Sequence, residues 1–121
     1  MIKLFSYLLL VSLLISCTGH KTEGSASGGK AQLLAFLNPY GEPCQMQSAI
    51  LKELGEKVTS KVELKSIFTT NPGDQESFYK YGVRGLPSLI LIDKNGEVIK
   101  RFSPGIQSGS EIMDVISSCK C

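Results

Sequence analysis

Residues 81–92 read YGVRGLPSLILI, and the six residues that follow read DKNGEV. The run from 89 to 92 is apolar throughout, which predicts a strand that is covered on both faces. Residues 93–96 form a tight-turn sequence that would reverse the chain. These segments predict an antiparallel hairpin whose second strand carries the apolar residues Val98, Ile99 and Phe102.

Two strand-helix units are predicted upstream of this hairpin. Residues 33–37 form an uninterrupted apolar run, typical of a central strand, and residues 38–41 (NPYG) end it. A second strand is predicted over residues 62–68, before a short helix that holds Phe78, Tyr79 and Tyr81. Between the two strands, apolar residues recur at helical spacing after Pro43, so we expect one helix whose buried stripe consists of Met46, Ile50, Leu51, Leu54 and Val58.

A last helix closes the chain. Its apolar residues fall at i, i+3, i+4 and i+7, which is typical of a helix with one buried face: Ile112, Val115, Ile116 and Cys119. The order of elements is then β-α-β-α-β-β-α. This order predicts an α/β fold, a four-stranded mixed sheet with helices on both faces.

Length and charge limit the possible functions. The chain has 121 residues, of which 42% are hydrophobic, so it can form one compact domain. Thirteen Lys and Arg residues face eleven Asp and Glu residues, a formal charge of +2. Such a balance provides no basic surface for phosphate backbones, so nucleic acid is not expected as a partner.

The N-terminal residues resemble a targeting segment. Lys3 is followed by an apolar run from Leu4 to Ile15, and Ser16 and Cys17 end it in a pattern that resembles a bacterial lipobox. We therefore predict a signal peptide over residues 1–16 and a lipid on Cys17. Residues 17–30 are rich in small residues and are expected to form a flexible linker, so the folded domain would span 31–121. The expected location is the bacterial cell envelope, outside the cytoplasm and anchored to the membrane.

The hairpin region resembles the second half of thioredoxin, and residues 36–44 (FLNPYGEPC) resemble the active-site stretch of that family. The resemblance covers residues 32–119 and implies a minimal thioredoxin-like fold. It also implies that Pro87 is the cis-proline that lies beside the active site. In the family, a Trp-Cys-Gly-Pro-Cys motif opens the helix.

The chain departs from the pattern of the family both inside and outside this motif. Gly41 stands where the family has its first cysteine, the nucleophile, and only the second cysteine position is filled, by Cys44. Ala35 replaces the buried aspartate of the family, and Tyr40 replaces the tryptophan. The intramolecular cycle of a Cys-x-x-Cys enzyme is therefore not expected.

Cys44 remains as the predicted catalytic residue. It lies in the first turn of a helix, where unpaired N–H groups favour a thiolate, and Gly41 has no side chain to cover its sulfur. We expect thiol-disulfide exchange or thiol binding, with protein or small-molecule thiols and disulfides as partners and an external thiol to complete release. The predicted substrate-binding residues are Tyr40, Gly41, Pro43, Leu86 and Pro87.

Two alternatives to this function stay open. Free cysteines are among the most buried residues, so Cys44 is alternatively an inert packing residue. The domain would then be a non-catalytic interaction module that keeps a peptide-docking surface around Pro87 and Tyr40. A thiol peroxidase is a weaker alternative, because Gly41 to Cys44 matches the spacing of the peroxiredoxin motif but lacks its threonine. Arg84 does not stand where that family has its arginine.

The chain ends in Cys119, Lys120 and Cys121, two possible accessory thiols. Cys119 continues an apolar stripe and is expected in the core, whereas Cys121 is expected to be exposed. The last helix would carry both about 15 Å from the active-site end, so a bond to Cys44 is disfavoured. A disulfide within the tail, pairing with another molecule or binding of a soft metal remain open. Two thiolates without a nearby histidine do not complete a zinc site, so neither a metal nor a cofactor is predicted.

Overall fold

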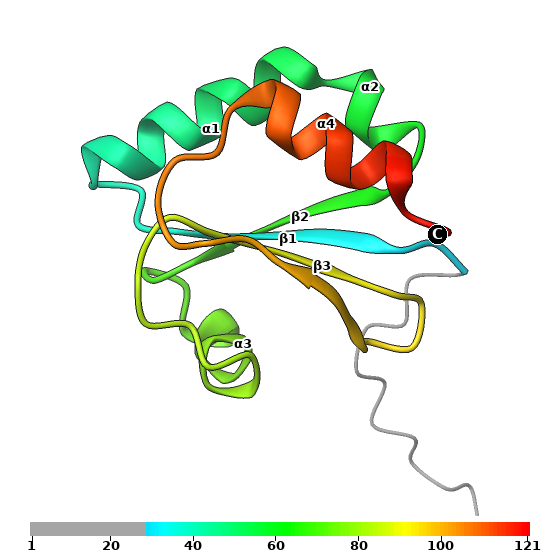
Figure 1. Cartoon of the computed structure of the whole chain (residues 1–121). Coiled ribbons are helices and arrows are strands. Elements are labelled where there is room, and N and C mark those ends of the chain that lie inside the picture. Colours follow the sequence, from blue (N-terminus) through cyan, green and yellow to red (C-terminus); the bar gives the residue numbers. More distant parts are fainter. Residues whose placement is uncertain (1–28) are drawn as a thin grey trace, which may run out of the picture.

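The computed structural model describes residues 29–121 and contains one four-stranded sheet (Figure 1). Its strands are β1 (Gln32–Leu37), β2 (Glu63–Phe68), β3 (Ser88–Ile92) and β4 (Val98–Arg101). They lie in the order β2-β1-β3-β4; β1 is parallel to β2, and the β1–β3 and β3–β4 pairs are antiparallel. The predicted α/β fold with a mixed sheet is confirmed.

Strand β1 is central, as its apolar run predicts. All six of its residues are buried, and the five apolar ones, residues 33–37, alternate between two hydrophobic clusters, one on each face of the sheet. Leu33, Ala35 and Leu37 face the first cluster, whereas Leu34 and Phe36 face the second. A strand covered on both faces needs no polar side chains, which is why this segment of the sequence is continuously apolar.

Helices cover both of these faces. On the first face lie α1 (Glu42–Leu54), α2 (Glu56–Thr59) and α4 (Gly109–Ser118). The helix α3 (Gln75–Lys80), which follows the 3₁₀ turn η1 (Pro72–Asp74), lies on the second face (Figure 1). There Phe36 of β1 packs edge-on against the rings of Phe78 and Tyr81.

The helix after β1 differs from the expected single helix. It ends at Leu54 because Gly55 has φ +45° and ψ −119°, a conformation that favours glycine, and α2 then starts in a new direction. The expected buried stripe was also wrong at Met46, which is 52% exposed. The neighbouring Gln47 is fully buried instead, together with Cys44 and Leu51.

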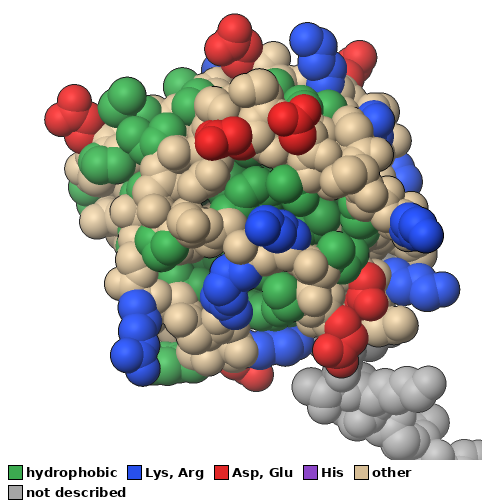
Figure 2. Space-filling model, viewed as in Figure 1, with side chains coloured by type: hydrophobic (Ala, Val, Ile, Leu, Met, Phe, Trp, Pro, Cys, Tyr) green, Lys and Arg blue, Asp and Glu red, His purple; other side chains and the backbone are tan. Residues whose placement is uncertain are grey.

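The β3–β4 hairpin places β4 at one edge of the sheet. The Asp93 amide donates to the Glu97 carbonyl, and the Asp93 carboxylate accepts from the amides of Asn95 and Glu97, as the turn sequence predicts. All four residues of β4 are exposed, and Lys100 and Arg101 are among them. Figure 2, which views the molecule from the same direction as Figure 1, shows Lys and Arg side chains among exposed hydrophobic side chains. Such charges on an edge strand oppose pairing with a second sheet.

Helix α4 begins with a capping box. The Ser108 hydroxyl accepts from the Glu111 amide, and the Glu111 carboxylate accepts from the Ser108 amide. This backbone hydrogen bond, helped by one from the Ser108 hydroxyl, lowers the pKa of the Glu111 carboxyl. The cap fixes the phase of α4, so that Ile112 and Ile116 point into the core as predicted.

A hollow of about 460 Å³ opens beside α3, over the start of β1 and the β3–β4 turn. Its lining includes Gln32, Lys65 and Tyr81, and none of the predicted redox residues contributes to it. None of the helices formed by residues 29–121 has the length and apolar character needed to cross a membrane. The predicted signal peptide, Cys17 and the linker up to residue 28 lie outside the described residues.

Candidate functional site

A tight turn joins β1 to α1 and sets the position of the site. The Gly41 amide donates to the Asn38 carbonyl at 3.0 Å, and the Tyr40 amide donates to the Asn38 side chain at 3.0 Å. The Gln45 side chain reaches back and donates to the Pro39 carbonyl. Asn38 is one of the residues predicted to end the strand, and asparagine before proline is a known turn signal.

Cys44 lies in the first turn of α1 and points into the protein. Its side chain is a free thiol with an exposed fraction of only 3%. It belongs to the hydrophobic cluster that also contains Ala35 and Leu37 of β1. The thiol is therefore screened from bulk water, a position that the sequence left open.

Gly41 lies beside the Cys44 sulfur. A Cβ atom added there would lie 3.8 Å from the Cys44 Sγ, and its other two nearest neighbours would be the Asn38 carbonyl oxygen and Cβ, at 3.5 Å and 3.7 Å. Gly41 itself is partly exposed. Its φ of −86° and ψ of 127° are ordinary extended values that any residue adopts. The backbone therefore does not require glycine here, and its absent side chain leaves a space beside the sulfur.

Pro87 lies at the same end of the sheet. The Leu86–Pro87 peptide bond is cis, as expected. Ser88 pairs with Phe36, which places Pro87 level with Leu37, the last residue of β1. The carbonyl of Pro87 accepts from the Gly105 amide at 2.9 Å.

Leu86 provides the free backbone groups near this proline. Within residues 29–121 its N–H and C=O form no hydrogen bond, and its side chain packs against both core clusters. The backbone available to an extended peptide is thus that of Leu86, whereas the carbonyl of Pro87 is already paired.

A buried glutamine that the sequence analysis missed links these parts. The Gln47 side chain donates to the Gln107 carbonyl at 3.1 Å and accepts from the Gln107 amide at 2.6 Å. Gln107 lies shortly after Gly105, whose amide donates a hydrogen bond to the Pro87 carbonyl. Gln47 therefore ties α1, three residues after Cys44, to the loop that supports Pro87. Its spacing from Cys44 and Leu51 on the helix was the available signal.

The predicted site residues fall into two groups. Tyr40, Gly41, Pro43 and Cys44 lie together at the start of α1, at the end of the sheet that also holds Leu86 and Pro87. Tyr40 is 83% exposed, so its ring is available to a partner. The two tail cysteines do not join this group.

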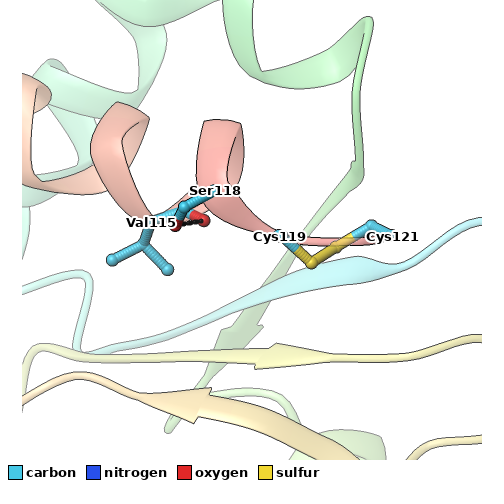
Figure 3. Close-up of a disulfide and its surroundings, with 4 residues drawn as sticks. All are labelled: Val115, Ser118, Cys119 and Cys121. Carbon is cyan, nitrogen blue, oxygen red and sulfur yellow. Dashed lines mark hydrogen bonds between the residues drawn. A yellow bond between two sulfur atoms is a disulfide. The ribbon is translucent and has the colours of Figure 1, made fainter.

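The tail cysteines are bonded to each other. Cys119 and Cys121 form a disulfide with their Cα atoms 5.2 Å apart, just beyond the end of α4 (Figure 3). Figure 1 shows the C-terminus beside the start of β1, whereas α1 begins at the other end of the sheet. One of the open alternatives for the tail is thereby confirmed, and so is the expectation that neither cysteine bonds to Cys44.

Comparisons with known proteins agree with this geometry. Residues 22–118 match the family model described as thioredoxin. The thioredoxin of Bacillus subtilis is 30% identical over 94 residues, which cover 77% of this chain and 86% of that protein. The chain belongs to the thioredoxin family.

Further thioredoxins support the assignment. That of Rickettsia bellii is 38% identical over 87 residues, which cover 71% of this chain and 78% of that one. A solved mutant thioredoxin from Halobacterium salinarum NRC-1 is 28% identical, with a TM-score of 0.63 over 74% of each chain. Thioredoxin-2 of the malaria parasite, at 20% identity, shares the fold with a TM-score of 0.66 over 75% of this chain and 84% of its own.

Membership of the thioredoxin family indicates a thiol-disulfide redox role, with thiol- and disulfide-bearing proteins as partners. Within that family, this chain keeps the fold and the cis-proline. It presents one sulfur at the start of α1 where the resemblance implies two. Ala35 is fully buried in the same cluster as Cys44, and its methyl side chain supplies no carboxylate to the thiol.

Proposed function

We propose that this thioredoxin-family protein carries out thiol-disulfide exchange through a single thiol, Cys44. The observation that carries the proposal is the space at Gly41, because a Cβ atom there would lie 3.8 Å from the Cys44 Sγ. A sulfur from a substrate can occupy this space, which a second active-site cysteine would otherwise fill. The substrate thus supplies the missing partner of Cys44.

The exchange needs one external thiol. The Cys44 thiolate attacks one sulfur of a substrate disulfide, a mixed disulfide forms, and the other substrate sulfur leaves as a thiolate that takes up a proton. An external thiolate then attacks the substrate sulfur of the mixed disulfide and restores the Cys44 thiolate. In balance, one thiol replaces another in the disulfide, and Cys44 is unchanged.

Burial selects the substrates of this reaction. With 3% of its surface exposed, Cys44 is closed to the bulk of a globular partner. Small disulfides, or a cysteine that protrudes from an extended peptide, fit the space beside Gly41. Such a peptide would pair with the free backbone of Leu86 and pack on the exposed ring of Tyr40.

The first prediction concerns the accessibility of Cys44. In the native protein we expect iodoacetamide, a small alkylating reagent, to label Cys44. For each reagent, the labelling rate on the native protein is divided by the rate on the unfolded chain. We expect this ratio to be at least about tenfold lower for a polyethylene-glycol maleimide than for iodoacetamide. Peptide mass spectrometry assigns the label, and a Cys44→Ser variant provides the control. We also expect oxidised glutathione to form a mixed disulfide with the wild type at Cys44 but not with this variant.

A Cys44 thiol that cannot be labelled in the native protein would refute thiol exchange. Labelling of Cys44 only after addition of denaturant would show that the thiol is a packing residue. The alternative of a non-catalytic interaction module would then hold, because it requires only the exposed Tyr40 and the Leu86 backbone. The low exposure of Cys44, 3%, is the observation that supports this second candidate function.

We further propose that the domain is tethered to the cell envelope through a lipid on Cys17. This proposal is supported by the sequence alone, namely the apolar run that ends at Ser16 and Cys17. For a Cys17→Ser variant expressed in a bacterium, we expect loss of labelling by radioactive palmitate and movement of most of the protein out of the membrane fraction. A Cys121→Ser variant is the matched control. Unchanged membrane association of Cys17→Ser would refute the lipid anchor.

A further inference from the structure

The Cys119–Cys121 disulfide is not explained by the stability of the fold. It joins two residues that are only two positions apart, so it closes a very short loop and constrains the unfolded chain little. Both cysteines lie at or beyond the end of α4, and the bond connects no second helix or strand. Its cleavage would therefore break no contact between elements.

The last turn of α4 is held without this bond. The Cys119 amide donates to the Val115 carbonyl at 3.1 Å, and the Ser118 hydroxyl donates to the same carbonyl at 3.1 Å (Figure 3). Cys119 also packs against the core cluster beneath α4. We expect Cys119 to stay in place when the disulfide is reduced, whereas Lys120 and Cys121 are released.

The two sulfurs differ in accessibility. Cys121 is exposed, and Cys119 is partly buried. An incoming thiolate therefore meets Cys121 first, and Cys119 becomes the leaving group. Lys120, which is exposed and lies between them, carries a positive charge that favours thiolates. This charge opposes the effect of the negative C-terminal end of the α4 dipole, which disfavours them.

The position of the tail separates it from Cys44. Gly109, the first residue of α4, lies against Ile50 and Leu54 in the second half of α1. From there α4 continues for about 15 Å to Cys119, and it runs along α2, away from the first turn of α1. Because a disulfide needs Cα atoms within about 7 Å, the tail cannot exchange directly with Cys44 of its own chain.

We propose that the Cys119–Cys121 disulfide is a second redox site of this protein, which accepts two electrons from a protein dithiol independently of Cys44. One thiolate of the partner attacks the Cys121 Sγ, the bond to Cys119 breaks, and the Cys119 thiolate takes up a proton. The second thiolate of the partner then attacks the partner's sulfur in the mixed disulfide and releases the Cys121 thiolate, which also takes up a proton. The partner ends as a disulfide and the tail as a dithiol, with two electrons and two protons transferred.

A protein dithiol fits this site better than a monothiol. The tail lies at the surface, where a folded partner can approach the exposed Cys121, in contrast to the enclosed Cys44. The second thiol of a dithiol completes the transfer within the mixed disulfide, whereas a monothiol would need a second molecule. The tail would thus serve protein partners that Cys44 excludes.

The test uses the full-length chain with the substitution Cys44→Ser, so that the tail alone is measured and failure of the Cys44 proposal does not affect the result. The oxidised protein is mixed under native conditions with a reduced Cys-x-x-Cys thioredoxin, and new thiols are alkylated. We expect two new thiols per chain, at Cys119 and Cys121. In a Cys121→Ser control no new thiol appears at Cys119, because it is already free.

Two measurements complete the test. Peptide mapping of the wild type with a glutamate-specific protease keeps both cysteines and Lys120 in one peptide and makes the result independent of how the Cys44→Ser variant folds. Thermal unfolding before and after reduction should agree within about 2 °C, because the bond stabilises no contact between elements. Failure of the protein dithiol to reduce the tail would overturn the proposal, and so would a clear fall in the melting temperature on reduction, which would identify a structural bond.

Discussion

Substitution of Gly41→Cys is expected to create a dithiol at the start of α1 and to raise the rate of protein disulfide reduction about 100-fold or more over the wild type, since a well-placed intramolecular thiol acts at a very high effective concentration. The introduced side chain would lie close to Cys44, because the Cβ position at Gly41 lies 3.8 Å from the Cys44 Sγ, and a small movement of the two side chains would bring the sulfurs within bonding distance. The extended backbone at Gly41 accepts the side chain without strain. The rate is measured as turbidity from insulin reduction with dithiothreitol as the reductant.

The new thiol would also take over the role of nucleophile. It would stand at the N-cap of α1, where the first-turn amides stabilise a thiolate, and Gly41 is more exposed than Cys44. A Gly41→Ser variant is the matched control, because serine has nearly the same size and no sulfur, and it should leave the wild-type rate unchanged or reduce it. Equal rates for Gly41→Cys and Gly41→Ser would contradict the assignment of this space as the position of the missing sulfur.

Substitution of Gln47→Ala is expected to destabilise the protein by roughly 2–4 kcal/mol, because it leaves the Gln107 amide and carbonyl without partners and opens a cavity beneath α1. The side chain is fully buried and forms two hydrogen bonds to a residue 60 positions away. Chemical unfolding followed by circular dichroism measures the free energy of unfolding. For a domain of this size, we expect the melting temperature to fall by about 10 °C or more.

Gln45→Ala provides the control on the same helix. The Gln45 side chain is exposed and forms a single hydrogen bond, to the Pro39 carbonyl, so its removal should change the free energy of unfolding by less than about 1 kcal/mol. The Gln47 variant should also increase the labelling of Cys44 by bulky reagents, because it loosens the link between α1 and the loop that supports Pro87. Similar stabilities for the two variants would show that Gln47 does not brace the site.

Much of the site was predictable because its signals are local in the sequence. The turn residues after β1, the cysteine in the first helical turn and the proline before β3 were all recognised from short segments. The depth of Cys44 was not, since burial of a thiol depends on how closely α1 lies on β1. Gln47 was missed because the helical stripe was assigned through Met46, and polar character alone argued against burial of a glutamine.

The order of the elements and the central strand follow from hydrophobic periodicity and turn residues, which act between near neighbours in the chain. The cis-proline at Pro87 was implied by the resemblance to thioredoxin and by no periodic pattern. The break at Gly55, the burial of Gln47 and the enclosure of Cys44 were decided only when α1, β1 and the loop before α4 packed together. Each of them depends on contacts between residues far apart in the chain. Whether a polar or reactive side chain is buried depends on the partner that it meets there, and no periodic pattern identifies that partner.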